Sequence, residues 1–313
     1  MKSRIIILAW ALILSCHIFA QEVTVNVATA GTLRSMVEAN DLQDATIIHV
    51  SGVINGDDVM VLKSLAGGKT GVENPLEGRL STLDLSEATI VEGGNPYYVS
   101  PNPLSSTYPN QCFTQNDTIG IYMFLDCKQL TDLMLPRSVK TIREAAFAGC
   151  SQLPTLNIPE GVTYIGAGIA RDCSCLKTVV IPTTTLQVHC WAFMGVSQGY
   201  TVSCLAPTPP RCVDYTLNGS PDDPSSYSFF DAEFDESVKG LTLLVPQESY
   251  NLYANDPVWS QFGHMQPFTL SSQPTTQFDA TSQQEVYYRI DGTRAHPSAS
   301  HGIILKKGKK VVK

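Results

Sequence analysis

Apolar positions recur with two periods in the middle of the chain, one short and one long. Within short stretches, apolar and polar residues alternate, which predicts β-strands with one buried face. The whole pattern then repeats every 23 residues, over residues 123–145, 146–168 and 169–191, and a weaker fourth copy follows. A repeat of this length predicts a solenoid, because a single coil can bury its apolar strand only against neighbouring coils.

Each copy carries an L-x-x-L-x-L triplet followed by proline. The triplets coincide when the copies are aligned: Leu130/Leu133/Leu135, Leu153/Leu156/Ile158 and Leu176/Val179/Ile181. The next residue is Pro136, Pro159 or Pro182, which cannot donate to a β-ladder and therefore ends each strand. This spacing predicts a leucine-rich-repeat solenoid that is right-handed, with a short parallel β-sheet, few short helices and much irregular structure.

Weaker copies extend the array in both directions. Strands with the same alternation are predicted around Ile48, Leu83 and Leu243, so that about seven coils carry a strand. Two long gaps between coils hold insertions, one from Gly93 to Asp117 and the other from Cys212 to Gly240. Long loops of this kind are often functional, so both insertions are of interest.

The first residues have the pattern of a secretory signal. Lys2 and Arg4 precede an apolar stretch at residues 5–14, and Ala20 offers a small residue for cleavage. We expect cleavage after Ala20, and the alternative is lipid attachment at Cys16 in the sequence ILSC. No later stretch reaches the roughly 20 apolar residues of a spanning helix, so no integral membrane span is expected after removal of the signal.

Charge separates the end of the chain from the rest. The 313 residues carry a formal charge of −8, yet residues 283–313 hold five Lys and two Arg against Glu285 and Asp291. We therefore expect a separate basic, β-rich tail. An acidic body lacks the clustered cations that phosphate binding needs, which excludes nucleic acid as the main partner.

These boundaries divide the chain into six parts. They are a signal peptide (1–20), an N-terminal cap with a first degenerate coil (21–79), leucine-rich repeats with insertions (80–240), a capping coil (241–268), a polar linker (269–282) and the β-rich tail (283–313).

The repeat unit resembles that of a known family. The string IREAAFAGCSQLPTLNIPEGVTYIG is similar to the BspA-type leucine-rich repeat of Bacteroidetes surface proteins, whose unit reads AFxxCxxLxxLxIPxxVxxIG. Two copies depart from this unit: the third has Ala170 in place of phenylalanine and loses the V-x-x-I-G half, and the fourth lacks the cysteine and the first leucine. The resemblance implies an adhesin or interaction protein at the cell surface, a class in which some members bind host matrix proteins. It implies no particular ligand, because ligands differ among proteins that share a fold.

Most cysteines fall on repeat positions. Cys127, Cys150 and Cys173 align between copies, which predicts a buried column of free thiols, since free cysteine is among the most buried residue types. Cys204 and Cys212 flank a proline-rich turn, where the sequence leaves two options, a disulfide or two free thiols.

Motifs for metal binding and catalysis are missing from the sequence. The residues Cys173, Cys175, His189 and Cys190 do not have zinc-site spacing, and the acidic stretch 222–236 has no Gly-punctuated D-x-D-x-D loop for calcium. There is no G-x-S-x-G, P-loop, HExxH or G-x-G-x-x-G motif. We therefore predict a protein that is not an enzyme and that uses no metal or other cofactor.

The strand alternation selects a candidate ligand-binding face. Where the apolar residues of a strand point into the core, the residues between them point outward onto the sheet, and solenoids commonly use this extended face for recognition. The face comprises Thr82, Asp84, Asp132, Met134, Thr155, Asn157, Thr178, Val180, Thr201 and Ser203. The insertion from Gly93 to Asp117, rich in Tyr, Pro and Asn, is an equally good candidate.

Two functions of different classes agree with this reading. The first is an exported adhesin, secreted or associated with the outer membrane at the cell surface, which binds a host or bacterial surface protein or glycan. The second is a structural or scaffold component of the cell envelope without an extracellular ligand. We favour the first, and an enzyme with unrecognised chemistry is the weakest hypothesis.

Overall fold

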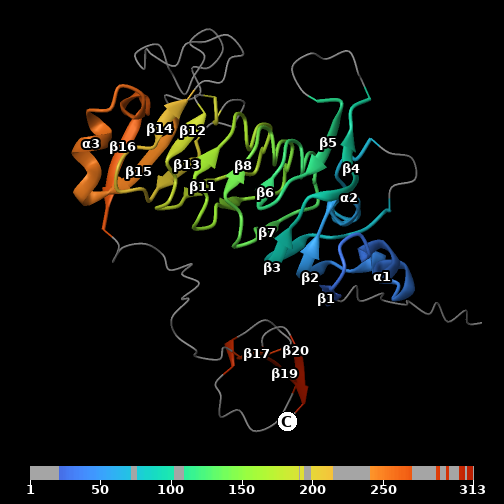
Figure 1. The fold of residues 1–313 in the computed structure, drawn as a ribbon. Coiled ribbons are helices and arrows are strands. Elements are labelled where there is room, and N and C mark those ends of the chain that lie inside the picture. Colours follow the sequence, from blue (N-terminus) through green and yellow to red (C-terminus); the bar gives the residue numbers. More distant parts are fainter. Residues whose placement is uncertain are drawn as a thin grey trace, which may run out of the picture.

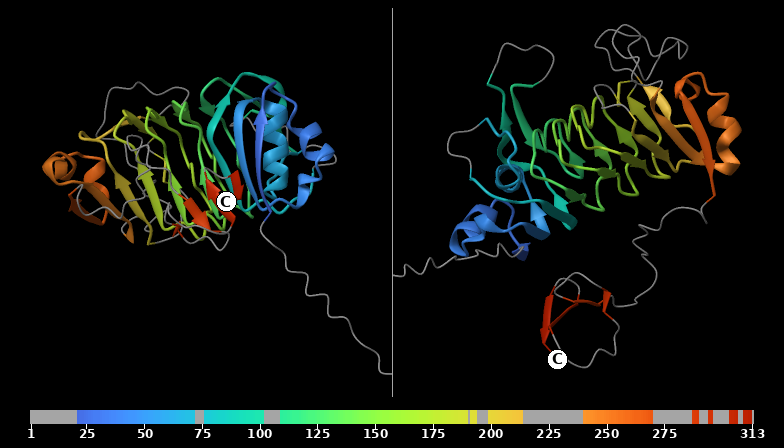
Figure 2. Two further views of the ribbon diagram at one scale, coloured as in Figure 1. Left: turned by 90° about the horizontal axis from the view of Figure 1, so that it is seen from below. Right: turned by 180° about the vertical axis from the view of Figure 1, so that it is seen from behind.

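The computed structural model describes residues 21–71, 76–101, 109–189, 191–193, 199–213 and 240–269, together with four strands of the tail. Within these residues the chain winds into a stack of coils that carries strands on two of its sides (Figures 1 and 2). The predicted signal peptide with Cys16, the residue Cys190, most of the second insertion and most of the linker lie outside the described residues.

The solenoid begins with strands and helices in alternation. They are strand β1 (Glu22–Val27), helix α1 (Leu33–Ala39), a 3₁₀ turn (Leu42–Asp44), strand β2 (Ile47–Ile54) and helix α2 (Gly56–Leu65). The two strands pair in parallel. Both helices lie at the start of the stack (Figure 1), where α1 contacts α2 and most residues of α2 are buried.

Helix α2 begins at a capping box. The Asn55 side chain accepts a hydrogen bond from the backbone of Asp57, and the Asp58 carboxylate accepts one from the backbone of Asn55. The same buried carboxylate accepts hydrogen bonds from the backbone amides of Gly31 and Leu33. Asp58 therefore fixes the start of α2 to the start of α1.

A parallel sheet runs along one side of the whole stack. After β1 and β2 it consists of β3 (Thr82–Ile90), β7 (Asp132–Met134), β9 (Thr155–Asn157), β11 (Thr178–Ile181), β13 (Thr201–Cys204), β15 (Thr242–Pro246) and β16 (His264–Phe268). Hydrogen-bonded ladders run from β1 to β7 and from β9 to β16, and β7 lies beside β9. We call this the main sheet.

The aliphatic residues of the main sheet form one buried row. Leu83 pairs with Leu133, Val179 lies between Leu156 and Val202, and Val202 pairs with Leu243. All six are at most 3% exposed. Full burial of each such side chain is worth about 1.5–3 kcal/mol, so neighbouring coils stabilise one another. The predicted leucine-rich-repeat solenoid, with its parallel strands and few short helices, is confirmed.

A second parallel sheet, which was not predicted from the sequence, lines another side of the coils. Its strands are β6 (Thr118–Ile119), β8 (Thr141–Ile142), β10 (Tyr164–Ile165), β12 (Gln187–His189) and β14 (Arg211–Val213). In register, Ile119, Ile142, Ile165 and Val188 point into the core and are fully buried. The V-x-x-I half of the repeat unit, at Val139 to Ile142 and at Val162 to Ile165, was the sequence signal for β8 and β10.

The predicted column of free thiols is confirmed. Cys127, Cys150 and Cys173 are buried and free. The Cys150 thiol donates to the carbonyl oxygen of Phe124 on the previous coil, and the Cys173 thiol donates to that of Phe147, each at 3.2 Å. These thiols therefore satisfy a backbone acceptor in the coil before.

Cys204 and Cys212 are both free thiols, so the disulfide option between them is wrong. They belong to different sheets, Cys204 to β13 and Cys212 to β14, and the Cys204 sulfur lies 3.2 Å from the hydroxyl of Tyr253.

The first insertion forms an antiparallel hairpin of β4 (Gly93–Val99) and β5 (Gln111–Thr114), which packs against α2. Tyr97 of β4 is buried and its hydroxyl donates to the carbonyl oxygen of Ile121 (2.8 Å). The hairpin is therefore attached to the first corner of the repeat stack.

The far end of the stack is closed by aromatic residues. Helix α3 (Tyr250–Ala254) and the 3₁₀ turns Gln247–Ser249 and Trp259–Gln261 connect β15 to β16. Tyr253 donates its hydroxyl to the carbonyl oxygen of Ala206, and Trp259 donates its indole N–H to that of Pro210, both at 2.8 Å. Both rings are fully buried, so they shield the last coil from water.

The tail forms a sheet of its own. Its antiparallel strands are β17 (Tyr287–Arg289), β18 (Arg294–Ala295), β19 (Ile303–Lys306) and β20 (Lys309–Val312), in the order β18-β17-β19-β20. None of the helices in the described parts of the chain is long and apolar enough to cross a membrane.

Candidate functional site

The predicted binding face is brought together as two rows along the main sheet. The first row holds Thr82 and Asp132 in register, and Thr155, Thr178 and Thr201 in register. These side chains are partly or fully exposed. A row of polar side chains, four threonines and Asp132, therefore follows the stack from coil to coil, as expected for residues that alternate with a buried row.

The second row is more varied. Asp84 pairs with Met134, and Val180 lies between Asn157 and Ser203. Ser203 is only 3% exposed, so its expected exposure on this face is wrong. Its neighbours in the row are Val180 and Leu244, whose larger side chains flank the small serine. The rest of the row reaches solvent.

A hydrogen-bonded group that sequence reasoning missed extends this face to the first strand. His49 of β2 lies in register with Asp84, and its two ring nitrogens are each 3.0 Å from a carboxylate oxygen, of Asp84 and of Glu22. The hydrogen bond with Asp84, together with that to Glu22, raises the pKa of His49 above its usual value despite partial burial. Only an in-register alignment of all three strands could have revealed this group.

The pKa values of two acidic residues on this face, Asp84 and Asp132, are shifted in opposite directions. Burial alone would raise the pKa of Asp84, but its hydrogen bonds with His49 and Ser86 lower it. Burial raises the pKa of Asp132, and the nearby charge of Asp84 adds to this effect. Asp84 is thus held as a carboxylate by its histidine, whereas burial favours the protonated form of Asp132.

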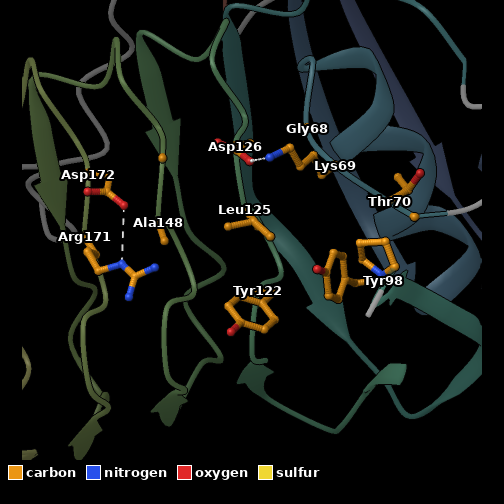
Figure 3. A pocket seen from close by; sticks show the side chains of 13 residues that line it. Gly68, Lys69, Thr70, Tyr98, Tyr122, Leu125, Asp126, Ala148, Arg171 and Asp172 are labelled. Atoms are coloured by element: carbon orange, nitrogen blue, oxygen red, sulfur yellow. Dashed lines mark ion pairs between the residues drawn. The ribbon is translucent and has the colours of Figure 1, made fainter. Parts of the chain in front are cut away.

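A second candidate site, also missed, is a hollow at the corners of the first coils (Figure 3). Its volume is about 710 Å³, within the roughly 300–1,000 Å³ range of small-molecule sites. We call it the corner trough, and its lining comprises Gly68, Lys69, Thr70, Gly71, Tyr98, Pro101, Tyr122, Leu125, Asp126, Ala148, Gly149, Arg171 and Asp172. Three parts of the chain form it: the segment after α2, strand β4 with the residues after it, and three successive repeats.

Aromatic side chains form one side of the corner trough. The rings of Tyr98 and Tyr122 have centroids 5.2 Å apart and are tilted by 60°. Below them, Lys63 of α2 is fully buried; its ammonium donates to the carbonyl oxygen of Tyr122 (2.5 Å) and lies 4.8 Å from the Tyr98 ring centroid. Burial lowers the pKa of Lys63 to about 8. One buried side chain therefore touches both tyrosines.

Ion pairs form the rest of the rim. Lys69 pairs with Asp126 at 2.7 Å, and Arg171 pairs with Asp172 at 3.3 Å. Figure 3 shows Leu125 between the Lys69–Asp126 pair and Tyr122, with Arg171 at the opposite end from Tyr98. Both basic side chains are more than half exposed, so each can reach a ligand while keeping its carboxylate partner.

The trough follows from the geometry of the corners. The backbone is left-handed at the equivalent positions of three coils, Asp126, Gly149 and Asp172, with φ of 56°, 74° and 61°. The middle coil has the small residues Ala148 and Gly149 where the next coil has Arg171 and Asp172. A Cβ at residue 149 would lie 2.4 Å from a carboxylate oxygen of Asp126, so any larger residue here would force the Asp126 side chain to shift. Small residues between larger ones leave the hollow.

Of the residues considered for zinc binding, the structure describes Cys173, Cys175 and His189, and these three do not gather into a metal site. In the parts of the chain that the structure describes, no three His, Cys, Asp or Glu side chains gather as metal ligands would. Cys173 is buried in the thiol column, whereas Cys175 is exposed and His189 belongs to β12. The acidic stretch 222–236 lies outside the described residues.

The stacked coils, the buried aliphatic row and the repeated corners define a leucine-rich-repeat protein. Residues 107–204 match the family described as BspA type leucine rich repeat region, in six copies. This part of the chain is therefore a BspA-type leucine-rich-repeat region, and repeats of this class serve as binding or scaffold modules. No curated protein matches the chain.

Proposed function

We propose that this chain is an exported adhesin, secreted or held at the cell surface in association with the outer membrane, which binds a surface protein or glycan of a host or another bacterium. Export is supported by the signal pattern at residues 1–20. Binding is supported above all by one observation, the exposed rows of the main sheet, which run in register from Thr82 to Asp132 and again from Thr155 to Thr201.

The composition of these rows favours recognition of a polar surface. The threonine hydroxyls and the Asn157 amide can donate and accept hydrogen bonds, and the Asp132 carboxylate can accept them. Met134 and Val180 add apolar area between these polar groups. A regular surface that spans several coils can bind an extended partner by many small contacts.

The proposal is tested by binding the purified full chain to arrays of extracellular matrix proteins and surface glycans. A triple variant, Asp132→Ala/Asn157→Ala/Thr178→Ala, removes polar groups from three successive strands. The matched control is Lys140→Ala, an exposed residue next to β8 of the second sheet. We expect the triple variant to lose binding and the control to keep it. Equal binding by both variants would show that the main sheet is not the adhesive face.

Location is tested separately. Cell fractionation combined with protease treatment of intact cells should release fragments of this chain from the surface or find it in the medium. Retention of the whole chain inside protease-resistant cells would contradict export, and with it the adhesin proposal.

A further inference from the structure

We propose that the corner trough binds a neutral oligosaccharide, a ligand class that deepens the proposed function and rests on it. Three properties of the trough support this: its apolar floor with a tyrosine side, its balanced charges, and the buried lysine that positions the tyrosines. None of them belongs to the predicted face on the main sheet, so the chain would carry two separate binding surfaces.

The apolar part matches one face of a sugar ring. A pyranose presents a flat C–H face, which packs on aromatic rings and on aliphatic carbon. In the trough, Tyr98 and Tyr122 lie side by side, and Leu125 and Ala148 continue the apolar floor toward Arg171 (Figure 3). The apolar floor is longer than one sugar ring, because it crosses the corners of successive coils. A chain of sugars therefore fits it better than a single compact ligand.

The charges favour a ligand without net charge. Lys69 and Arg171 are each paired with a carboxylate, of Asp126 and of Asp172, so that the charged groups of the trough lining cancel. An anionic ligand would have to compete with the two carboxylates, and a cationic ligand with the ammonium and the guanidinium. Hydroxyl groups escape this conflict, because each can donate to a carboxylate and accept from a neighbouring cation.

The tyrosines are held by a costly arrangement. Lys63 is fully buried, and a buried ammonium is unfavourable unless it is hydrogen-bonded. Its hydrogen bond goes to the backbone of Tyr122, and its charge faces the ring of Tyr98. The backbone at Tyr122 is itself in the left-handed region, with φ of 58°, a conformation that a bulky residue rarely adopts. Lys63 is thus a positioning residue for the aromatic side of the trough.

The test is isothermal titration calorimetry of the purified full chain with defined hexasaccharides. The neutral probes are maltohexaose, cellohexaose and mannohexaose, and the acidic probe is hexagalacturonate. We expect at least one neutral probe to bind, and the acidic probe to bind at least about tenfold more weakly. If no neutral probe binds, or if the acidic probe binds best, the proposal is overturned.

Two variants test whether the sugar binds in the corner trough. Tyr122→Gly removes a ring at a position where glycine is preferred by the backbone, and Arg171→Gln removes the guanidinium at the other end. Each is expected to raise the Kd by about tenfold or more. The matched control is Ala145→Gly, at the equivalent left-handed position of the next coil, with φ of 51° and outside the trough lining. An unchanged Kd in Tyr122→Gly would overturn the assignment.

Failure of this inference is distinguishable from failure of the adhesin proposal. If calorimetry shows no sugar binding but binding to the arrays still depends on Asp132, Asn157 and Thr178, only the trough proposal is contradicted. If the chain binds sugar through Tyr122 but is retained inside the cell, only the adhesin proposal is contradicted.

Discussion

Lys63 and Tyr122 are joined across 59 residues of sequence by a hydrogen bond from the lysine ammonium to the tyrosine carbonyl oxygen. The lysine belongs to helix α2 of the cap, and the tyrosine lies at the first corner of the repeats. This contact, together with the backbone hydrogen bond from Lys69 to Leu125, attaches the cap to the repeat stack where the corner trough opens. The stability of the cap and the shape of the trough therefore depend on the same residues.

The first prediction concerns the charge of Lys63. Burial lowers the pKa of Lys63 from 10.5 to about 8, so the folded chain binds fewer protons than the unfolded chain between these pH values. The free energy of unfolding should therefore gain a contribution on the order of 3 kcal/mol from this group as pH rises through that window. The variant Lys63→Met lacks this gain.

Urea denaturation at pH 7, 8, 9 and 10 measures the difference between wild type and Lys63→Met. Lys69→Met is the matched control, because Lys69 is exposed on the trough rim and its pKa is raised by the hydrogen bond to Asp126. We expect the stability difference between wild type and Lys63→Met to change with pH, while Lys69→Met follows the wild type in this window. Parallel curves for wild type and Lys63→Met would contradict a buried ammonium.

The second prediction concerns His49. Its pKa is raised in the folded state, so the stabilisation is complete below the unfolded value of 6.5 and is lost as pH rises through the folded pKa. Wild type should therefore exceed His49→Gln in stability at pH 5.5, and this advantage should disappear at pH 9. The pKa of Asp84 is lowered, so its contribution is lost only in more acidic solution.

Urea denaturation at these pH values and an NMR titration of the His49 ring protons provide the measurements. High salt should reduce the effect, because the three side chains are partly exposed and salt screens such pairs. A histidine pKa at or below 6.5 would show that the carboxylates of Glu22 and Asp84 do not hold the ring.

The third prediction concerns thiol reactivity. Burial raises the pKa of Cys173 to about 12 and that of Cys204 to about 11, whereas Cys175 is exposed. Since the thiolate is the reactive form, Cys175 should be alkylated by iodoacetamide in the native chain while Cys150 and Cys173 are alkylated only after unfolding. Peptide mass spectrometry locates the modified sites. Rapid modification of Cys150 in native protein would contradict the buried column.

The repeats were predictable because their signal is redundant. Leu133, Leu156 and Val179 occupy equivalent positions in three successive copies of the repeat. A register error would therefore expose all of them together. The thiol column was predictable for the same reason. The outward-facing rows then follow from strand alternation, with the exception of Ser203, whose flanking residues on neighbouring strands decide its burial.

The corner trough could not be predicted in the same way. It depends on Tyr98 of the insertion, Lys69 after α2 and Arg171 of a repeat, which are far apart in sequence and share no motif. The composition of the insertion indicated a candidate binding loop, but only the folded chain places Tyr98 against Tyr122. The one local signal was the change from Ala148-Gly149 to Arg171-Asp172 between equivalent corners.

The last prediction separates the two faces of a repeat strand. Leu156 is fully buried in the middle of the aliphatic row, and Asn157 beside it is exposed on the main sheet. Leu156→Ala removes buried carbon and leaves a cavity between coils, so it should lower the free energy of unfolding by about 2–5 kcal/mol. Asn157→Ala should change it by no more than about 0.5 kcal/mol, because an exposed side chain away from special contacts contributes little. Urea denaturation of both variants gives the comparison. Similar losses for the two would mean that strand β9 does not have the alternation on which the stacked coils and the outward face both depend.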